Sequence, residues 1–183
     1  MTEEKNYYSI QRKFWKIFAP FYDIAVWPAS KLRDTVVTYV NAPRGAKILD
    51  VSTGTGKQAF AFAKKGFDVV GIDLSEAMLK IARKKNKRKN LKFELADASE
   101  LPFESGSFDV SCVSLALHEM PLTVREKVLQ EMVRVTKPKG KVVTIDFDLP
   151  GNKVGRFLIY NFLRLFEGEH YVKYVKSDLK KSI

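Results

Sequence analysis

Five short runs of apolar, often β-branched residues alternate along the chain with longer segments of helical periodicity, and this alternation restricts the fold. It is typical of βαβ units, in which helices cover a parallel sheet. We therefore predict an α/β fold with a Rossmann-like, doubly wound and mostly parallel sheet. The predicted strands cover residues 47–51, 68–72, 91–95, 108–114 and 141–147, and the helices between them cover 57–65, 75–86 and 123–136.

The helix predicted over residues 123–136 has the clearest signals. Val124, Val128 and Met132 recur at helical spacing. Thr123 followed by Glu126 has the spacing of a capping box, which predicts that the helix begins at Thr123.

Apolar segments lie on both sides of this α/β region. The aromatic-rich residues 7–27 predict one or two amphipathic helices, and a further helix is expected over 30–40. Residues 154–166 are nearly all apolar, but about 20 residues are needed to cross a bilayer. We expect a single domain with three parts: a helical lid (1–42), a cofactor-binding α/β core (43–148) and a C-terminal helical segment (149–183).

The composition excludes several classes of protein. The chain has 183 residues, of which 45% are hydrophobic, enough for one core of ordinary size. Its single cysteine, Cys112, excludes an internal disulfide framework and a cysteine-rich zinc site, and no metal-ligand spacing is recognisable. We therefore expect no metal ion. Residues 1–6 are polar and acidic, unlike a signal peptide, so we expect a cytoplasmic protein.

The net charge of +11 has two interpretations. Much of the excess lies in residues 80–92, KIARKKNKRKNLK, which could bind nucleic acid or an anionic membrane. The same run is also typical of the solvated face of a helix, because Met78, Ile81 and Ala82 supply a buried stripe. No aromatic side chains interleave with the lysines to stack on bases, so we favour the solvated face.

The segment with most chemical information is ILDVSTGTGKQAF, residues 48–60. A buried strand leads into Asp50, then into a loop of small residues, then into the start of a helix. Glycines such as Gly54 and Gly56 let the backbone approach a ligand closely. The helix start adds free N–H groups and a partial positive charge.

Three classes of ligand could use this loop. A phosphate-binding P-loop requires Ser or Thr after Gly-Lys, and Gln58 stands there instead. A dinucleotide site fits better, because residues 54–59 match G-x-G-x-x-A. Asp50 argues against it, since a carboxylate at the strand end repels a pyrophosphate and attracts an ammonium group. S-adenosylmethionine carries such an ammonium and no phosphate.

Two further acidic residues follow the next predicted strands. Asp73 ends the second strand, where a carboxylate can accept both ribose hydroxyls, as it also does in NAD enzymes. Asp97 follows the third strand, where a carboxylate and an adjacent N–H can bond the adenine edge. Each acid alone is more often a cap or loop residue. Together they mark the carboxyl edge of the sheet, where open α/β sheets bind ligands.

In their order and spacing, five segments resemble the class I S-adenosylmethionine-dependent methyltransferases, in the branch similar to the ubiquinone/menaquinone-biosynthesis enzymes (methyltransferase type 11). The segments, which lie within residues 18–147, are ILDVSTGTGKQAF, VVGIDLSEAML, LADASELPFESGSFDV, LALHEMPL and VRVTKPKGKVVTIDF. The resemblance implies S-adenosylmethionine as cofactor and S-adenosylhomocysteine as product.

The resemblance also implies the cofactor contacts. The first loop would hold the methionine moiety, the second and third strand ends the ribose and adenine, the fourth strand end the sulfonium region, and one N-terminal tyrosine would close over them. The matching residues are Tyr22, Asp50, Ser52, Gly54, Gly56, Asp73, Leu74, Met78, Asp97, Ala98, Ser114 and Leu115.

The chain departs from the family pattern at two places. Ser52 stands where the family usually has glycine, which could weaken cofactor binding. The last two strands of the seven-stranded family sheet are missing from the predicted elements. Since a bare sheet edge favours association, we expect this edge to be paired in a homodimer or covered by a helix over 154–166.

Candidate catalytic residues are His118 and Glu119, directly after the fourth predicted strand. They could remove a proton from an O-, N- or C-nucleophile, although a His–Glu pair is often only structural. His170, with Glu167 and Glu169, forms a second polar cluster.

The apolar flanks favour a small apolar or amphipathic acceptor, so we predict a methyltransferase for such a molecule. The alternatives are a nucleic-acid methyltransferase, in particular one acting on RNA, a catalytically silent S-adenosylmethionine-binding module, and a Rossmann oxidoreductase. The first lacks an Asn-Pro-Pro-Tyr signature after the fourth strand.

Overall fold

A five-stranded sheet with the strand order β3-β2-β1-β4-β5 organises the computed structural model, which describes residues 3–25 and 30–146. All four strand pairs are parallel, as predicted for a Rossmann-like sheet. The strand order reverses between β1 and β4, which opens a ligand-binding crevice at the carboxyl edge. The strands are β1 (Lys47–Val51), β2 (Asp68–Asp73), β3 (Leu91–Leu95), β4 (Phe108–Ser114) and β5 (Thr136–Ile145).

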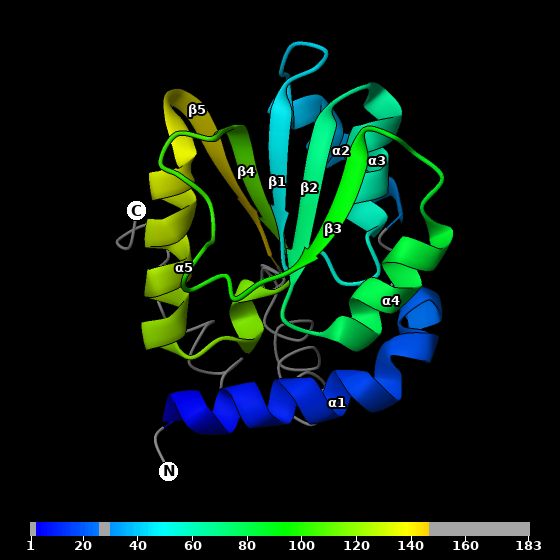
Figure 1. Ribbon diagram of the computed structural model, residues 1–183, viewed down its shortest axis with the longest axis vertical. Coiled ribbons are helices and arrows are strands. Elements are labelled where there is room, and N and C mark those ends of the chain that lie inside the picture. Colours follow the sequence, from blue (N-terminus) through cyan, green and yellow to red (C-terminus); the bar gives the residue numbers. More distant parts are fainter. Residues whose placement is uncertain (1–2, 26–29, 147–183) are drawn as a thin grey trace, which may run out of the picture.

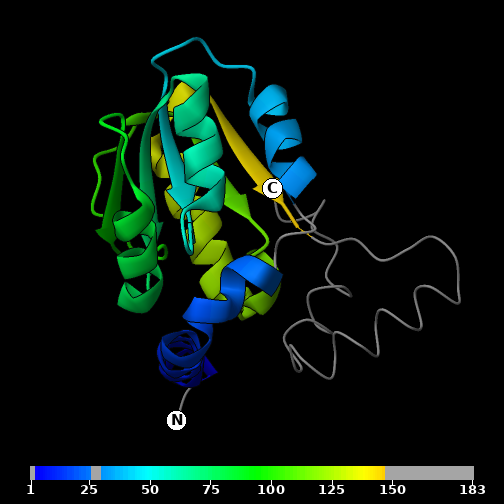
Figure 2. The ribbon, with the colours of Figure 1, turned by 90° about the vertical axis from the view of Figure 1, so that its right-hand side faces the viewer.

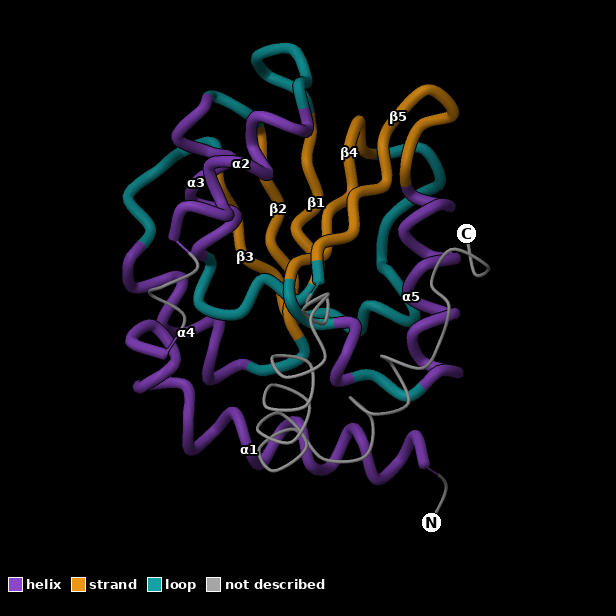
Figure 3. Tube along the Cα trace, turned by 180° about the vertical axis from the view of Figure 1, so that it is seen from behind, coloured by secondary structure: helices purple, strands orange, loops and turns teal. Residues whose placement is uncertain are grey.

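Helices cover both faces of the sheet, as the doubly wound prediction required. Helices α2, α3 and α4 share one apolar cluster with the sheet, whereas α5 packs into a second cluster on the opposite face. Figure 1 shows α5 on the near side, and Figure 3, from behind, brings α2 and α3 to the front. The helices are α1 (Glu3–Ala25), α2 (Ser30–Val40), α3 (Lys57–Lys65), α4 (Glu76–Lys85) and α5 (Leu122–Val135), with a short 3-10 helix η2 (Leu117–Glu119).

The boundaries around α5 differ from the prediction. The helix begins at Leu122 after Pro121, and no side chain caps its first turn, so the predicted capping box is wrong. Thr123 instead donates its hydroxyl to the carboxylate of Glu4 on α1. At the other end β5 begins at Thr136, directly after the helix, rather than at residue 141. A register shift in the pairing of β4 with β5 accommodates these extra residues.

Helix α1 lies across the carboxyl edge of the sheet. Figure 1 shows it running below the strand ends, and Figure 2 shows it nearly end-on in the same position. Its contacts reach several separate segments: Glu4 pairs with Lys127 of α5, Tyr8 bonds Ser99, and Asp23 pairs with Lys85 of α4. The predicted N-terminal helix therefore lies over the edge where a ligand would bind.

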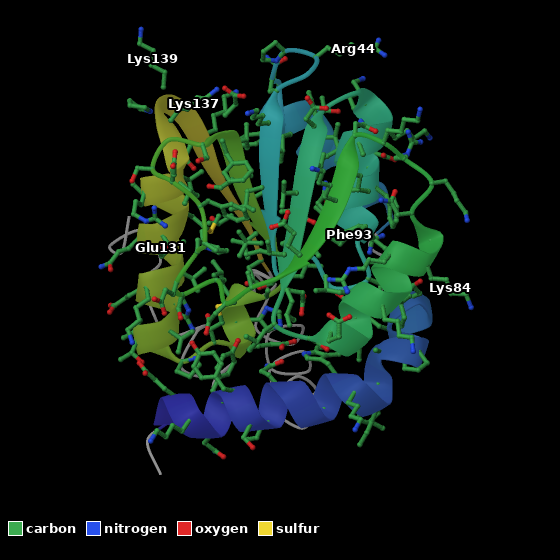
Figure 4. The ribbon with its side chains drawn as sticks, viewed as in Figure 1. Arg44, Lys84, Phe93, Glu131, Lys137 and Lys139 are labelled. Carbon is green, nitrogen blue, oxygen red and sulfur yellow. The ribbon has the colours of Figure 1, made fainter. Side chains whose placement is uncertain are left out.

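The basic run of residues 80–92 begins on the outer face and last turn of α4 and continues through the loop after that helix into β3. Met78, Leu79 and Ala82 are buried, whereas Lys84 projects away from the fold in Figure 4. Cations in a last turn also interact favourably with the helix dipole. Arg44, Lys137 and Lys139 lie at the opposite end of the molecule from α1 in Figure 4.

Several predictions fall on residues 147–183, which lie outside the described part of the chain. They concern the apolar helix over 154–166, the polar cluster of Glu167, Glu169 and His170, and whatever covers the edge beside β5. Within the described residues, no helix is long and apolar enough to cross a membrane.

Candidate active site

The loop after β1 has the tight geometry that its small residues predicted. Ser52, Gly54 and Gly56 have φ angles of 54°, 57° and 83°, all in the left-handed region. Gly56 caps the N-terminus of α3, and its main-chain carbonyl accepts the N–H of Phe60. The loop thereby turns the chain from β1 into α3 and directs its backbone into the crevice.

Asp50 lies beneath this loop and is only 1% exposed. The Thr53 hydroxyl donates to its Oδ2 atom at 2.5 Å, and the N–H of Ala59 donates to the same carboxylate. Burial outweighs both hydrogen bonds and raises the pKa of Asp50 to about 7. The fold by itself therefore disfavours the ionised form of Asp50, and a cationic group next to Asp50 would stabilise that form.

Asp73, at the end of β2, holds the loop in place. Its Oδ2 atom accepts the N–H of Gly54 at 2.8 Å, and its Oδ1 atom accepts the N–H of Ser75 at 2.8 Å. Burial raises the pKa of the Asp73 carboxyl, although the N–H groups of Ser75, Gly54 and Leu74 oppose this effect. Each carboxylate oxygen carries more than one lone pair, so the side chain can accept further hydrogen bonds.

Asp97 follows β3 and is oriented by its neighbours. The Ser99 N–H and hydroxyl donate to Asp97 Oδ1 at 2.9 and 2.8 Å. The Tyr8 hydroxyl, from α1, lies 3.0 Å from the Ser99 hydroxyl and donates more weakly to Asp97 at 3.4 Å. Helix α1 thus contacts the third acidic residue of the predicted site directly.

Two narrow cavities meet at Ser52. The first lies at the ends of β2 and β3, and the second lies between α2, the loop after β1 and the end of β4. Asp73, Leu74, Asp97, Ala98, Tyr7 and Tyr8 belong to the first; Asp50, Tyr22, Arg33, Lys57, Ser114 and Leu115 belong to the second.

The second cavity contains charges of both signs. Asp50 supplies a carboxyl group, whereas Arg33 and Lys57 supply cations. Lys57 is held by Asp23 of α1, whose main-chain carbonyl accepts its ammonium at 2.9 Å. A zwitterionic amino-acid group, with an ammonium and a carboxylate, matches this arrangement.

Aromatic residues of α1 cover the loop after β1. The Tyr22 ring lies 3.6 Å from the position that a Cβ on Gly54 would take, and Trp15 packs edge-on against Tyr22 at 5.4 Å. Burial, reinforced by the Glu119 carboxylate, raises the pKa of Tyr22 to about 12. The Tyr22 hydroxyl therefore stays protonated and can act as a donor.

The predicted catalytic pair lies beside the end of β5, with His118 buried and Glu119 partly exposed. His118 is 2% exposed, and its Nδ1 atom lies 2.5 Å from Oδ1 of Asp146. Its Nε2 atom lies 4.0 Å from Oε1 of Glu119. On the other side, Gln11 of α1 donates to Oε2 of Glu119 at 2.9 Å.

The fold brings most of the predicted site residues together at one edge. Five of the predicted residues border neither cavity: Met78, which is buried in α4, and Gly54, Gly56, His118 and Glu119. The sequence interpretation did not include Tyr7, Tyr8, Gln11, Arg33 and Asp146. Asp146 lies within the fifth predicted strand, residues 141–147, but in the structure β5 ends at Ile145 and Asp146 directly follows it. The overlong strand prediction therefore concealed an acidic residue at the carboxyl edge.

We expect Ser52→Gly to stabilise the protein by about 0.5–1 kcal/mol, because glycine adopts a φ of 54° without the cost that a Cβ imposes. Urea unfolding measures this change. The matched control is Asn41→Gly at a φ of 42°, where a smaller gain is expected because Asn tolerates the left-handed region. If Ser52→Gly is no more stable than the wild-type protein, the inference that Ser52 is strained is wrong.

Comparisons with known proteins agree with this geometry. Residues 49–144 match the family described as "Methyltransferase domain". A demethylmenaquinone methyltransferase of Renibacterium salmoninarum is 39% identical over 72% of this chain, which spans only 56% of that relative. A demethylmenaquinone methyltransferase of Bacillus velezensis is 31% identical over 96% of this chain and 79% of its own.

A solved structure shows the same fold. The crystal structure of a putative methyltransferase from Bacillus halodurans C-125 superposes with a TM-score of 0.64 at 27% identity. The alignment covers 75% of this chain and 61% of the other.

Proposed function

Since the chain belongs to the class I S-adenosylmethionine-dependent methyltransferases, in their ubiquinone/menaquinone-like branch, we propose that it methylates a small apolar or amphipathic acceptor. The observation that carries the proposal is the pair of cavities meeting at Ser52, one lined by acids at the strand ends and one with charges of both signs. The similarity to demethylmenaquinone methyltransferases favours a reduced quinone of the demethylmenaquinone type as acceptor.

The residues present fit S-adenosylmethionine. Asp50 would hold its ammonium and Arg33 its carboxylate, while Asp73 would accept the ribose hydroxyls and Asp97 would face the adenine. When bound, the cofactor supplies an electrophilic methyl group on a positive sulfur. The loop geometry and the aromatic residues of α1 would align the reactants and exclude water.

Methylation of a quinol carbon gives His118 and Glu119 a role in removing the hydroxyl proton of the acceptor. An aromatic carbon next to a hydroxyl group becomes a better nucleophile when that hydroxyl loses its proton. His118 is the proposed proton acceptor, and Glu119 is the neighbouring charge that stabilises the protonated imidazole. A proton abstraction of this kind contributes about 10²–10⁴-fold to a rate.

Two measurements on the full chain test the proposal. Calorimetry with S-adenosylhomocysteine tests the cofactor class, and incubation with S-adenosylmethionine and a reduced short-chain demethylnaphthoquinone tests transfer. We expect micromolar or tighter binding, of about −8 kcal/mol or better, and a product heavier by one CH2 group. No binding of either adenosyl compound would refute the methyltransferase assignment, whereas binding without transfer to any quinol would refute the acceptor class.

A catalytically silent binding module is the second candidate, because Ser52 is strained where the family usually has glycine. Cofactor binding without turnover on quinols, phenols, amines or thiols would favour it. NADH and RNA titrations address the remaining two alternatives. Tight binding of NADH, or RNA binding that weakens steeply with salt, would count against the small-molecule methyltransferase.

A further inference from the structure

Polar side chains form a continuous chain across the carboxyl edge, from helix α1 to the end of β5. Trp15 Nε1 donates to Gln11 Oε1 at 2.5 Å, and Gln11 Nε2 donates to Glu119 Oε2 at 2.9 Å. Glu119 Oε1 lies 4.0 Å from His118 Nε2, and His118 Nδ1 lies 2.5 Å from Asp146 Oδ1. Three structural elements that are distant in sequence are thus joined through one histidine.

Asp146 fixes the histidine through two contacts. Besides the Nδ1 contact, its Oδ2 atom accepts the main-chain N–H of His118 at 3.1 Å. Its side chain is 5% exposed, so little water competes with these bonds. An ionised carboxylate only accepts hydrogen bonds, so Nδ1 must carry a hydrogen, and in the neutral imidazole the lone pair then lies on Nε2.

Gln11 fixes the other side of the histidine. Its amide cannot rotate freely, because Trp15 Nε1 occupies the oxygen and Glu119 occupies the NH2 group. Glu119 is thereby held with one oxygen toward Nε2 of His118. This contact exists only while α1 lies across the edge of the sheet.

We propose that Asp146 and Gln11 are positioning residues, which make Nε2 of His118 the proton acceptor of the reaction. The inference rests on the proposed function and adds two residues from outside the predicted site. The acceptor hydroxyl gives its proton to Nε2, and the resulting imidazolium lies between the carboxylates of Asp146 and Glu119. When bound, the cofactor would supply the methyl group to the nucleophilic carbon, with the electron pair of its C–S bond staying on sulfur. The ring carbon would lose its own proton to water, and the acceptor oxygen would recover a proton from the imidazolium of His118.

The surroundings of His118 define what a pH profile reports. Among the described residues, the titratable and charged groups around η2 include Asp146 beyond β5, Glu119 of η2 itself, Arg125 of α5, and Tyr7 and Tyr22 of α1. Arg125 is directed to the carbonyls of Leu117 and Met120. Burial raises the pKa of Tyr7, so this phenol stays neutral.

The decisive variant is Asp146→Asn. An Asn amide can donate to Nδ1 and so place the hydrogen on Nε2, which then cannot accept a proton. We expect kcat near neutral pH to fall about 10²–10³-fold, with the affinity for S-adenosylhomocysteine changed less than about twofold. The defect should shrink as pH rises and the acceptor ionises unaided. Thr144→Ala, at an exposed position of β5 two residues before Asp146, is the matched control.

A readout without turnover separates this inference from the proposed function. Nitrogen-15 NMR of the wild-type protein should show the Nδ1–H tautomer of His118, assigned against His118→Gln, and Asp146→Asn should lose it. The Nε2–H tautomer in the wild-type protein would refute the inference, as would equal losses of kcat and cofactor affinity at every pH. An active wild-type enzyme with unchanged kcat in Asp146→Asn would refute it too, while leaving the proposed function intact.

Gln11→Leu tests the second positioning residue. It removes the donor to Glu119 and keeps the helical propensity of α1, so we expect kcat to fall about tenfold with cofactor affinity retained. Lys16→Ala, an exposed position on the same helix, should have no effect. A loss of cofactor affinity equal to the loss of kcat would show that Gln11 only anchors α1.

Discussion

Asp50→Asn will weaken the binding of S-adenosylmethionine by about 30-fold or more. The carboxylate is 1% exposed and faces the cavity in which the ammonium of the cofactor would lie. Removing one partner of a desolvated charge pair costs about 2–5 kcal/mol, which corresponds to a factor of about 30 to several thousand. Calorimetry with S-adenosylmethionine and S-adenosylhomocysteine measures the loss.

The same variant should be more stable than the wild type in alkaline buffer. Burial raises the pKa of folded Asp50 from 3.8 to about 7, so below pH 4 the group is protonated in both states and contributes nothing. Between pH 4 and pH 7 the folded state keeps a proton that the unfolded state releases, and stability falls as pH rises. Above pH 7 we expect Asp50→Asn to gain about 1–4 kcal/mol, since Asn escapes this penalty but has only one acceptor oxygen.

Thermal unfolding at pH 4.5 and pH 8 checks the stability of Asp50→Asn. Asp68→Asn, on the exposed amino end of β2, is the control and should change neither binding nor the pH dependence. A loss of affinity in Asp50→Asn without any gain at pH 8 would mean that Asp50 is not penalised by burial. Unchanged affinity would show that no ammonium lies against it, and the cofactor pose would be wrong.

Wild-type binding should itself depend on pH. Affinity for S-adenosylmethionine should rise up to about tenfold per unit as pH approaches 7 and Asp50 ionises, and should fall above about pH 8 as the α-amino group loses its proton. In Asp50→Asn the rising limb should vanish while the falling limb remains.

Gly56→Ala should destabilise the fold by about 3 kcal/mol or more. Gly56 has a φ of 83°, where an L side chain is strained by about 1 kcal/mol or more. A Cβ there would lie 2.5 Å from Cζ of Phe93 and 3.1 Å from Cε2 of Phe60. Phe93 is buried in β3 with its ring toward the core cluster, so its displacement disturbs packing as well.

Gly45→Ala separates the two causes. Gly45 has nearly the same φ, 81°, but nothing lies within 4 Å of the Cβ position. We expect this control to lose only the conformational term, about 1 kcal/mol. Urea denaturation of both variants gives the difference, and equal losses would contradict the steric argument at Gly56.

Local sequence patterns predicted the centre of the molecule well. Strands β1, β3 and β4 and helix α3 have the predicted bounds, because buried β-branched runs alternate with amphipathic segments and glycines mark the turns. The loop after β1 was predictable from its glycines. Gly54 and Gly56 have positive φ angles, which few residue types other than glycine tolerate.

Contacts between distant segments were not predictable in this way. The pattern of α1 predicts an amphipathic helix but carries no signal for which loops it contacts, so Tyr8 beside Ser99 and Gln11 beside Glu119 were missed. Thr123 had the local spacing of a cap, yet it bonds Glu4 of α1. Tertiary contacts determine which hydrogen-bond partner such a side chain takes, and a single sequence does not show those contacts.

The way α1 spans the crevice has a kinetic consequence. Asp23 of α1 bonds Thr55 in the loop after β1 as well as Lys57 and Lys85, and Tyr22 covers Gly54. We therefore expect a bound adenosyl compound to leave only when α1 moves away from these contacts. Each contact is weak, but all must open in one event, so release of spent cofactor should set the turnover rate and should respond to solvent viscosity.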